Sequence, residues 1–226
     1  MTSNSCIEIV TFIQDWIWPI VASIVTVVLI YLFQKPRIAL HISDDDKPNV
    51  AFGAKFVHLV VENKSKGILG GGSANHCKGI IKVHSGNGQE KEFVTKWASQ
   101  RDPISMQYLP MSNGQMGGIK KVDLIGIEEC KYENFFPGER KKLDVAMKID
   151  NDASCYIHEP ENFLQIYTQR KNPKNEYGAG KFFCEATIAC SNTKSNKLKF
   201  YLLNDGQNMD GLTLKPYTEN KKTNKP

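Results

Sequence analysis

The glycine-rich run GILGGGSANH, Gly67 to His76, is the part of this sequence whose composition best suits phosphate binding. Several glycines close together let backbone N–H groups converge on an anion. A P-loop also needs a Lys followed by Ser or Thr and a helix after the loop, and this run is followed by neither. We therefore interpret it as a strand-to-strand loop whose glycines supply positive φ angles.

Five histidines and one acidic run suggest metal binding, but their spacing does not support it. His76 and Cys77 are adjacent, and neighbouring strand residues point to opposite faces. The chain contains no C-x-x-C or H-x-x-x-H spacing, so we interpret His58 and His84 as surface or interfacial side chains. Asp44 to Asp46 lack the alternating acids, glycine and distal Glu of an EF-hand. We predict a solvated acidic turn there, no metal and no cofactor.

Nucleophilic catalysis has no local signature in this chain. There is no G-x-S-x-G motif, and Cys77 and Cys184 lie on the apolar side of strand-like segments, where a thiol is usually inert. We therefore assign no catalytic residue. Because triads assemble from distant positions, an enzyme or ligand sensor with a pocket of dispersed residues stays open as an alternative.

Cysteine usage bears on the compartment. The six cysteines are too sparse for a disulfide scaffold: Cys6, Cys77, Cys130, Cys155, Cys184 and Cys190. Cys184 and Cys190 lie in one extended segment, ~20 Å apart, which far exceeds the ~7 Å Cα limit for a bridge. We expect reduced, buried thiols in a cytoplasmic domain.

An uncharged apolar run from Trp16 to Phe33 separates a short N-terminal segment, residues 1–15, from the rest. As a helix it would be ~27 Å long, close to the ~30 Å hydrocarbon core of a bilayer. A cleaved signal peptide would need basic residues before the run and a small-residue cleavage site, and the sequence has neither. A buried helix would need a large helical core around it. We predict a retained single-pass transmembrane helix in contact with the lipid bilayer.

The flanking charges predict the orientation. Lys35 and Arg37 follow the run, while only Glu8 and Asp15 precede it. The positive-inside rule then places the N-terminus outside and the C-terminal domain in the cytoplasm, at the cell membrane.

Between Pro36 and Leu214 the apolar residues alternate with a period of two, which is typical of half-buried strands. In one segment we place Asp144 and Lys148 on the wet face, opposite a buried row of Leu143, Val145, Met147 and Ile149. The segments with this pattern are FVHLVVE from Phe56, HCKGIIKVH from His76, KEFVTKW from Lys91, KLDVAMKID from Lys142, NFLQIYTQ from Asn162, KFFCEATIAC from Lys181 and KLKFYLLND from Lys197.

Turn signals such as Pro137-Gly138 and Asn204-Asp205-Gly206 separate these segments, and no convincing helical stripe follows Phe33. We therefore predict a mainly β fold: one transmembrane helix, then an antiparallel, immunoglobulin-like β-sandwich of about seven to nine strands over residues 34–213. Residues 214–226, rich in Lys, Asn and Pro, are expected to form a disordered basic tail.

The block from Phe56 to Val83 resembles a pattern of uncharacterised, mostly prokaryotic membrane-tethered β-domains. There a strand of the form H-L-x-V-x-N precedes a polar loop and A-x-x-C-x-G, and the loop here, residues 68–73, is more glycine-rich. Trp97 and the segment PGE-x-x-x-L-D from Pro137 to Asp144 are also similar. The matching residues are His58, Leu59, Val61, Asn63, Ala74, Cys77 and Gly79. The family has no assigned activity, so the resemblance implies the fold and no chemistry.

The distribution of charged residues indicates which classes of partner to expect. All 29 basic residues and 22 of the 24 acidic ones follow Gln34, which gives this part a net charge of +7. The basic residues are spread out, with small clusters at 140–142 and 221–222, and no RNP-like or helix-turn-helix signature accompanies them, so we predict no nucleic acid. We expect a non-enzymatic interaction or scaffold module with an unidentified protein partner. Its oligomeric state does not follow from the sequence.

Overall fold

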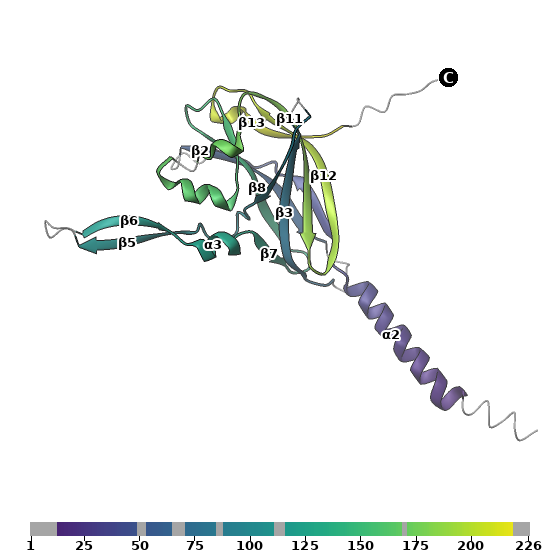
Figure 1. The fold of residues 1–226 in the computed structure, drawn as a ribbon. Helices are drawn as coiled ribbons and strands as arrows, with labels where there is room; N and C mark the ends of the chain where they lie inside the picture. Colours follow the sequence, from purple (N-terminus) through teal and green to yellow (C-terminus); the bar gives the residue numbers. More distant parts are fainter. Residues whose placement is uncertain are drawn as a thin grey trace, which may run out of the picture.

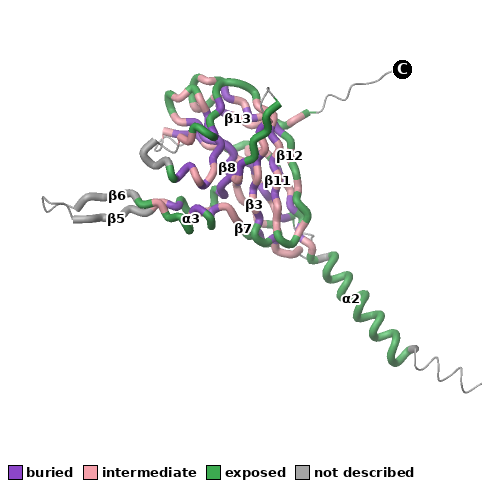
Figure 2. Tube along the Cα trace, viewed as in Figure 1, coloured by how far each residue is buried: buried purple, intermediate pink, exposed green. Residues whose placement is uncertain are grey.

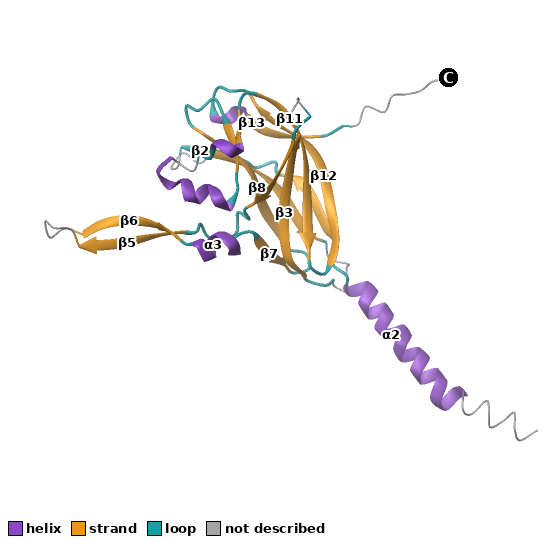
Figure 3. Cartoon of the chain, in the orientation of Figure 1, coloured by secondary structure: helices purple, strands orange, loops and turns teal. Residues whose placement is uncertain are grey.

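The computed structural model describes residues 13–48, 53–64, 71–84, 88–110, 116–168 and 171–218 (Figure 1). An apolar helix near the N-terminus leads into a body of two antiparallel sheets, which confirms the mainly β fold class. Figure 3 shows how little helix the body itself contains. Residues 1–12 and 219–226, and the first four residues of the glycine run from Gly67 (67–70), lie outside the described residues.

The N-terminal helix starts with a π-helical turn, η1 (Ile13–Ile17), and continues as α2 (Trp18–Gln34). Pro19 lies in the first turn of α2, where a missing N–H costs nothing, and Pro36 follows the end, where it forces Lys35 into an extended conformation. The stretch Gln14–Leu32 is long and apolar enough to cross a membrane, and none of it is buried against the body. The predicted apolar run is therefore a free-standing helix (Figure 2).

The three-residue linker after α2 is held to the body by hydrogen bonds at successive positions. The backbone N–H of Arg37 donates to Asn63 Oδ1 at 3.2 Å, and Asn63 Nδ2 donates to the carbonyls of Gly72 and Phe135. Thr193 Oγ1 donates to the carbonyl of Pro36 at 3.0 Å. Because Asn63 is fully buried, these bonds are shielded from water. The linker between α2 and the sandwich is thus fixed to the sandwich by hydrogen bonds.

Two sheets form the body. Sheet A has the strand order β1 (Ile38–Ile42), β2 (Ala54–Asn63), β8 (Arg140–Ile149), β9 (Cys155–Ile157) and β10 (Glu176–Tyr177). Sheet B has the order β13 (Leu212–Pro216), β12 (Thr193–Asn204), β11 (Gly180–Cys190), β3 (Ala74–His84) and β4 (Glu90–Thr95), with β7 (Tyr132–Phe135) also paired to β3. The sheets have five and six strands, more than the seven to nine expected.

The core lies between the sheets. It follows the predicted alternation on β2, β3, β4 and β11, whose inward residues are buried while their neighbours are partly exposed. Gly79 on β3 lies directly against Leu143 on β8, and a methyl group at Gly79 would lie 2.6 Å from Leu143 Cδ2. Representative core residues are Val57, Leu59 and Leu143 from sheet A and Ile81, Ala186 and Leu202 from sheet B.

The expected face pattern of β8 is wrong because the strand contains a bulge. Val57 pairs with Ala146 and the next residue, His58, pairs with Asp144, so Val145 has no partner on β2. An extra residue reverses the alternation beyond it. Lys148, which lies beyond the bulge, therefore turns inward and is fully buried, with its ammonium donating to Asn204 Oδ1 of sheet B at 2.5 Å. Asp144, which comes before the bulge, points away from the core as expected, opposite His58, but it is buried there between the side chains of His58 and His158. Neither residue lies on a wet face.

The expectation of reduced thiols is wrong for one pair. Cys77 on β3 and Cys190 on β11 form a disulfide with Cα atoms 4.0 Å apart, although 113 residues separate them. The antiparallel β3–β11 ladder pairs Lys78 with Ala189 and so places the two cysteines opposite each other. Cys184 and Cys190 do not bridge, as expected, and Cys130, Cys155 and Cys184 are free and buried.

Three further segments differ from the sequence prediction. NFLQIYTQ was expected to be a strand, but Pro160–Thr168 is the 3-10 segment η4, which Pro160 can begin because its φ is fixed near helical values. Strands β5 (Ile104–Pro110) and β6 (Met116–Val122) form a hairpin that projects from the body, followed by the short helix α3 (Leu124–Glu129) (Figure 1). Strand β13 continues to Pro216, beyond the Leu214 boundary expected for the tail.

Two further short 3-10 turns complete the described elements. They are η5 (Pro173–Asn175), before β10, and η6 (Met209–Gly211), before β13.

Candidate functional site

Asp46, His58, Asp144 and His158, here called the Asp–His network, form a chain of alternating acids and imidazoles on the outer face of sheet A. His58 Nδ1 lies 2.7 Å from Asp46 Oδ1, and His58 Nε2 lies 3.2 Å from Asp144 Oδ1. His158 Nδ1 lies 3.0 Å from Asp144 Oδ2. Each charged group therefore has an opposite partner on at least one side.

Local structure brings these four residues together from separate segments. The antiparallel β2–β8 pairing sets Asp144 opposite His58 on β2, and His158 follows β9. Asp46 comes from the β1–β2 loop, where its carboxylate also accepts from the His58 backbone N–H at 2.7 Å. The rings of Phe56 and Phe163 lie 5.1 and 5.7 Å from the His158 ring and cover that end of the network.

The network has a fixed charge arrangement near neutral pH. Burial by itself would lower the pKa of His58, but hydrogen bonds and charges from Asp144 and Asp46 outweigh it and raise the pKa to about 9. Burial would raise the pKa of Asp144, but His158 and His58 hold it well below its usual range. The pKa of Asp46 is lowered by the same balance, with His58 opposing burial. His58 is therefore a cation between two carboxylates.

The Asp–His network stabilises charged side chains and is not arranged for catalysis. Both nitrogens of the His58 ring are occupied by carboxylates, and His158 Nε2 is buried without a hydrogen-bond partner. Among the described residues, no hydroxyl or thiol is hydrogen-bonded to either imidazole, so a nucleophile–base pair is not formed there.

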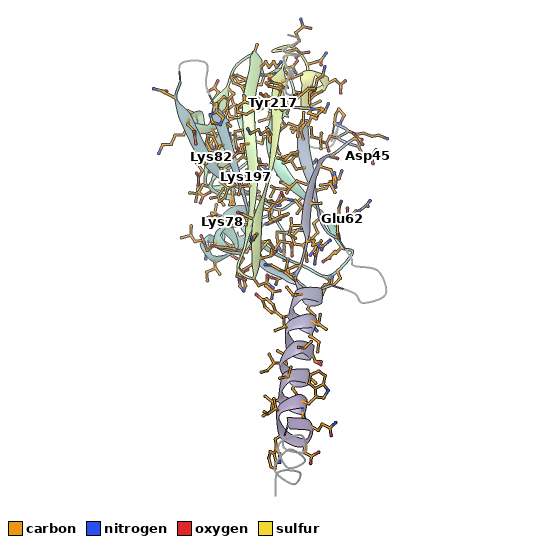
Figure 4. The ribbon with its side chains drawn as sticks, turned by 90° about the vertical axis from the view of Figure 1, so that its right-hand side faces the viewer. Asp45, Glu62, Lys78, Lys82, Lys197 and Tyr217 are labelled. Atoms are coloured by element: carbon orange, nitrogen blue, oxygen red, sulfur yellow. A yellow bond between two sulfur atoms is a disulfide. The ribbon has the colours of Figure 1, made fainter. Side chains whose placement is uncertain are left out.

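A second feature is the outer face of sheet B, where aromatic rings from β11, β12 and the residue after β13 gather. We call the group Phe183, Tyr201 and Tyr217 the aromatic face. Ring centroids are 5.2 to 6.1 Å apart within it, and His84 on β3 lies 5.0 Å from Phe183 at its edge. All of these rings are partly exposed. Figure 4 looks onto this sheet and shows Tyr217 on it.

Three lysines surround the aromatic face. Lys181 Nζ lies 3.8 Å from the Tyr201 ring centroid, Lys199 Nζ lies 6.0 Å from that of Tyr217, and Lys215 pairs with Tyr201 across β12 and β13. These three form no ion pair with any described residue. Lower on the same sheet, by contrast, Lys82 pairs with Glu90 and Glu92 and Lys197 pairs with Glu185. Within the part of the chain that the structure describes, the basic charge at the aromatic face therefore has no acidic partner.

A cleft of about 660 Å³ lies between the base of the β5–β6 hairpin and α3. Charged residues of both signs line it, among them Arg101, Asp123 and Glu129, and no histidine does. Cys130 also lines it, but burial raises the pKa of that thiol to about 11, which disfavours a nucleophilic thiolate. Two exposed apolar residues of α3, Leu124 and Ile125, lie beside it.

The structure separates the residues that the sequence singled out. His76 is exposed, with a positive φ of 48°, and His84 lies on the other end of β3. Asp44 and Asp45 are exposed, as expected for a solvated turn, whereas Asp46 belongs to the network. The basic cluster at 140–142 is paired: Arg140 with Glu62, Lys141 with Glu133 and Glu139, and Lys142 with Asp46.

The residues of the prokaryotic resemblance have structural roles in this fold. His58 belongs to the Asp–His network, Asn63 holds the linker, Cys77 forms the disulfide, and Gly79 admits Leu143. Sequence reasoning missed the network and the aromatic face because both depend on strand pairing. The available signal was the row of aromatic and Lys residues at alternate positions in KFFCEATIAC and KLKFYLLND.

Comparison with protein-family models, curated proteins and solved structures finds no match for this chain. The fold and surfaces nevertheless define a class of protein. It has an antiparallel two-sheet body that follows one apolar helix, and a lysine-rimmed aromatic face on the outer side of sheet B.

Proposed function

We propose that this protein is a membrane-anchored, non-enzymatic interaction module. Helix α2 acts as a single-pass signal anchor in contact with the bilayer, and the immunoglobulin-like sandwich is presented beside the membrane to a protein partner. The observation that carries this proposal is the exposure of the whole span Gln14–Leu32 on a body whose own core is complete. An apolar helix of that length without a protein partner fits lipid better than water.

The aromatic face is the docking surface of this proposal. Tyr and Phe provide large contact area at low entropic cost, and aromatic residues are enriched at the centres of interfaces. Lys181, Lys199 and Lys215 supply an uncompensated positive rim. We infer that the partner presents an acidic segment with apolar side chains, because such a segment matches both the rings and the charge.

We place the sandwich on the cytoplasmic side because Lys35 and Arg37 flank the helix at that end. The Cys77–Cys190 bond is more typical of oxidising compartments. However, the β3–β11 ladder holds these two cysteines side by side whether or not they are joined. The flanking charges therefore decide our assignment, and labelling of the sandwich on intact cells by a membrane-impermeant lysine reagent would contradict it.

The alternative of a membrane-tethered enzyme or ligand sensor has less support. Its pocket would have to gather His, Asp or Cys side chains, yet the Asp–His network and the cleft at α3 are separate places. In the cleft the thiol is poorly ionised, and in the network the imidazoles are bound to carboxylates.

A photo-crosslinking experiment tests the proposal. A crosslinkable residue replaces Tyr201 in the full chain in native membranes, and the same residue replaces Lys47, an exposed lysine of the β1–β2 loop, as a matched position. We expect a protein adduct at position 201 and none at 47. The triple variant Lys181→Glu, Lys199→Glu and Lys215→Glu should abolish the adduct while the protein stays in the membrane fraction.

Two results would contradict the proposal. Release of the wild-type protein by alkaline carbonate would show that α2 is not a membrane span. Equal adducts at positions 201 and 47, insensitive to the triple variant, would show that the aromatic face is no docking surface.

A further inference from the structure

A cleft lies where helix α2 meets the sandwich. Its volume is about 440 Å³, and it is formed by three segments that meet only in the folded chain. Leu32 comes from the end of α2, Lys35 and Arg37 come from the linker, and Lys194, Ser195 and Asn196 come from the start of β12. Figure 1 shows the lower end of β12 beside the first residues after α2.

The charge of this cleft is positive and uncompensated. Lys35, Arg37 and Lys194 line it, no acidic residue among those described does, and none of the three forms an ion pair with a described residue. Elsewhere in the body most partly buried lysines have acidic partners, as Lys131 and Lys141 do. Three cations around one hollow repel each other unless an anion joins them.

The walls of the cleft are fixed before any ligand arrives. Asn196 Nδ2 donates to the carbonyl of Ile38 at 2.5 Å and Thr193 Oγ1 donates to that of Pro36, so β12 and the linker are bonded to each other. The Ser195 side chain is exposed, and no hydrogen bond from its hydroxyl to a described residue is seen. A preformed site of this kind loses little freedom on binding.

The position of the cleft selects the ligand. Leu32 closes the apolar span and is 54% exposed, so in a bilayer this end of α2 lies where hydrocarbon gives way to headgroups. Lysine binds phosphate as a point charge and arginine as a bidentate fork. An acyl chain can continue along the exposed apolar surface of α2.

We propose that this cleft binds the phosphate-bearing headgroup of an anionic phospholipid. The inference rests on the membrane anchor proposed above and adds a lipid specificity to it. Anionic lipids are concentrated in the cytoplasmic leaflet, on the side to which the positive flank assigns the sandwich.

Nanodiscs containing the full chain test this proposal. The discs hold phosphatidylcholine with a minor fraction of phosphatidylglycerol, and native mass spectrometry counts the lipids that stay on the protein after release from the disc. We expect phosphatidylglycerol to be retained preferentially. Lys194→Glu should reduce that preference about tenfold. Because Lys194 is far from the span in sequence, the variant leaves the flanking charges that direct insertion unchanged.

The matched control is Lys174→Glu. Lys174 is also exposed, forms no ion pair with a described residue and lies in η5, away from α2. An equal loss of preference in both variants would show that only overall charge matters and would overturn the proposal. Inorganic phosphate is the second arm: displacement of the lipid by dilute phosphate would assign the cleft to a soluble anion instead.

The experiment distinguishes a wrong membrane anchor from a wrong headgroup site. A protein that is extracted by alkaline carbonate and does not assemble into the discs contradicts the proposed function itself. A protein that assembles into discs and retains both lipids equally contradicts only the headgroup site. An unchanged circular dichroism spectrum of Lys194→Glu shows that the variant is folded.

Discussion

At the scale of single residues, the Asp–His network links stability to pH. The pKa of His58 is raised from 6.5 to about 9, so the folded state binds this proton more tightly than the unfolded state. Its contribution is fully present below pH 6.5 and is lost as pH rises through about 9. The lowered pKa values of Asp46 and Asp144 have the opposite sign: their contribution is present above pH 3.8 and is lost at lower pH.

We predict that the free energy of unfolding falls by about 3 kcal/mol between pH 6.5 and 9 because of His58. Chemical unfolding of the protein in detergent, followed by tryptophan fluorescence at several pH values, measures this slope. His58→Gln should remove most of the slope and lower stability throughout, since two carboxylates lose their cation.

His41→Gln is the control for this prediction. The His41 side chain is 54% exposed and lies 3.9 Å from Glu62, so its removal should leave the slope unchanged. A wild-type slope that survives in His58→Gln would mean that the network does not titrate in this range.

Residue-level prediction from the sequence succeeded where burial follows strict alternation and failed at the β8 bulge. Leu59, Ile81 and Phe93 are buried as the pattern requires. The pattern places Lys148 in solvent because an extra residue on one strand is invisible until its partner strand is known. Asp144 does point away from the core, but the residues that bury it and complete the Asp–His network come from other segments, so the sequence alone indicates an ordinary surface or interfacial role for His58.

At the scale of elements, the contact between β3 and β8 depends on Gly79. A side chain at this position would overlap Leu143 of the opposite sheet. We predict that Gly79→Ala lowers the free energy of unfolding by about 2 kcal/mol through overpacking. The same fluorescence-monitored unfolding measures the change.

Gly178→Ala is the matched control, because a methyl group there meets no atom within 4 Å. Combining Gly79→Ala with Leu143→Ala should cost less than the sum of the two single changes, since the smaller side chain makes room for the methyl group. Strict additivity would show that the two residues are not in contact.

The helices and strands that the sequence predicts correctly are those whose pattern lies within the element itself. The apolar helix and the strands β2, β3, β11 and β12 follow from composition and alternation. The η4 segment was mistaken for a strand because eight alternating residues fit both structures, and Pro160 decides for the helical turn. The Cys77–Cys190 bond joins strands far apart in sequence, and no local pattern predicts such a pairing. The aromatic face lies on the consecutive strands β11 and β12 and the end of β13, but its rings meet only in the register of those strands.

At the scale of the whole molecule, the hydrogen-bonded linker makes helix and sandwich a single unit. We predict a narrow distance distribution between spin labels at Ser23 in α2 and Lys215 on β13, measured by pulsed electron resonance in nanodiscs. The double variant Asn63→Ala and Thr193→Ala removes the bonds that hold the linker and should broaden the distribution.

Asn196 and the β1–β2 ladder remain in that variant, so the sandwich itself should stay folded. Ser154→Ala, which removes an exposed hydrogen bond far from the linker, should leave the distribution narrow. An equally broad distribution in the wild-type protein would show that the linker swivels.

The rigid connection between α2 and the sandwich also fixes the distance of the aromatic face from the C-terminal end of α2. Strand β12 starts beside the C-terminal end of α2 at Thr193, and Tyr201 lies eight residues further along it. With α2 spanning a bilayer as proposed, ~3.3 Å per residue places the rings on the order of 20 Å from the lipid surface. In that arrangement, peptides lying flat among the headgroups do not reach them. A partner that binds the aromatic face must therefore be a soluble protein, or a membrane protein whose binding segment extends a comparable distance from the bilayer.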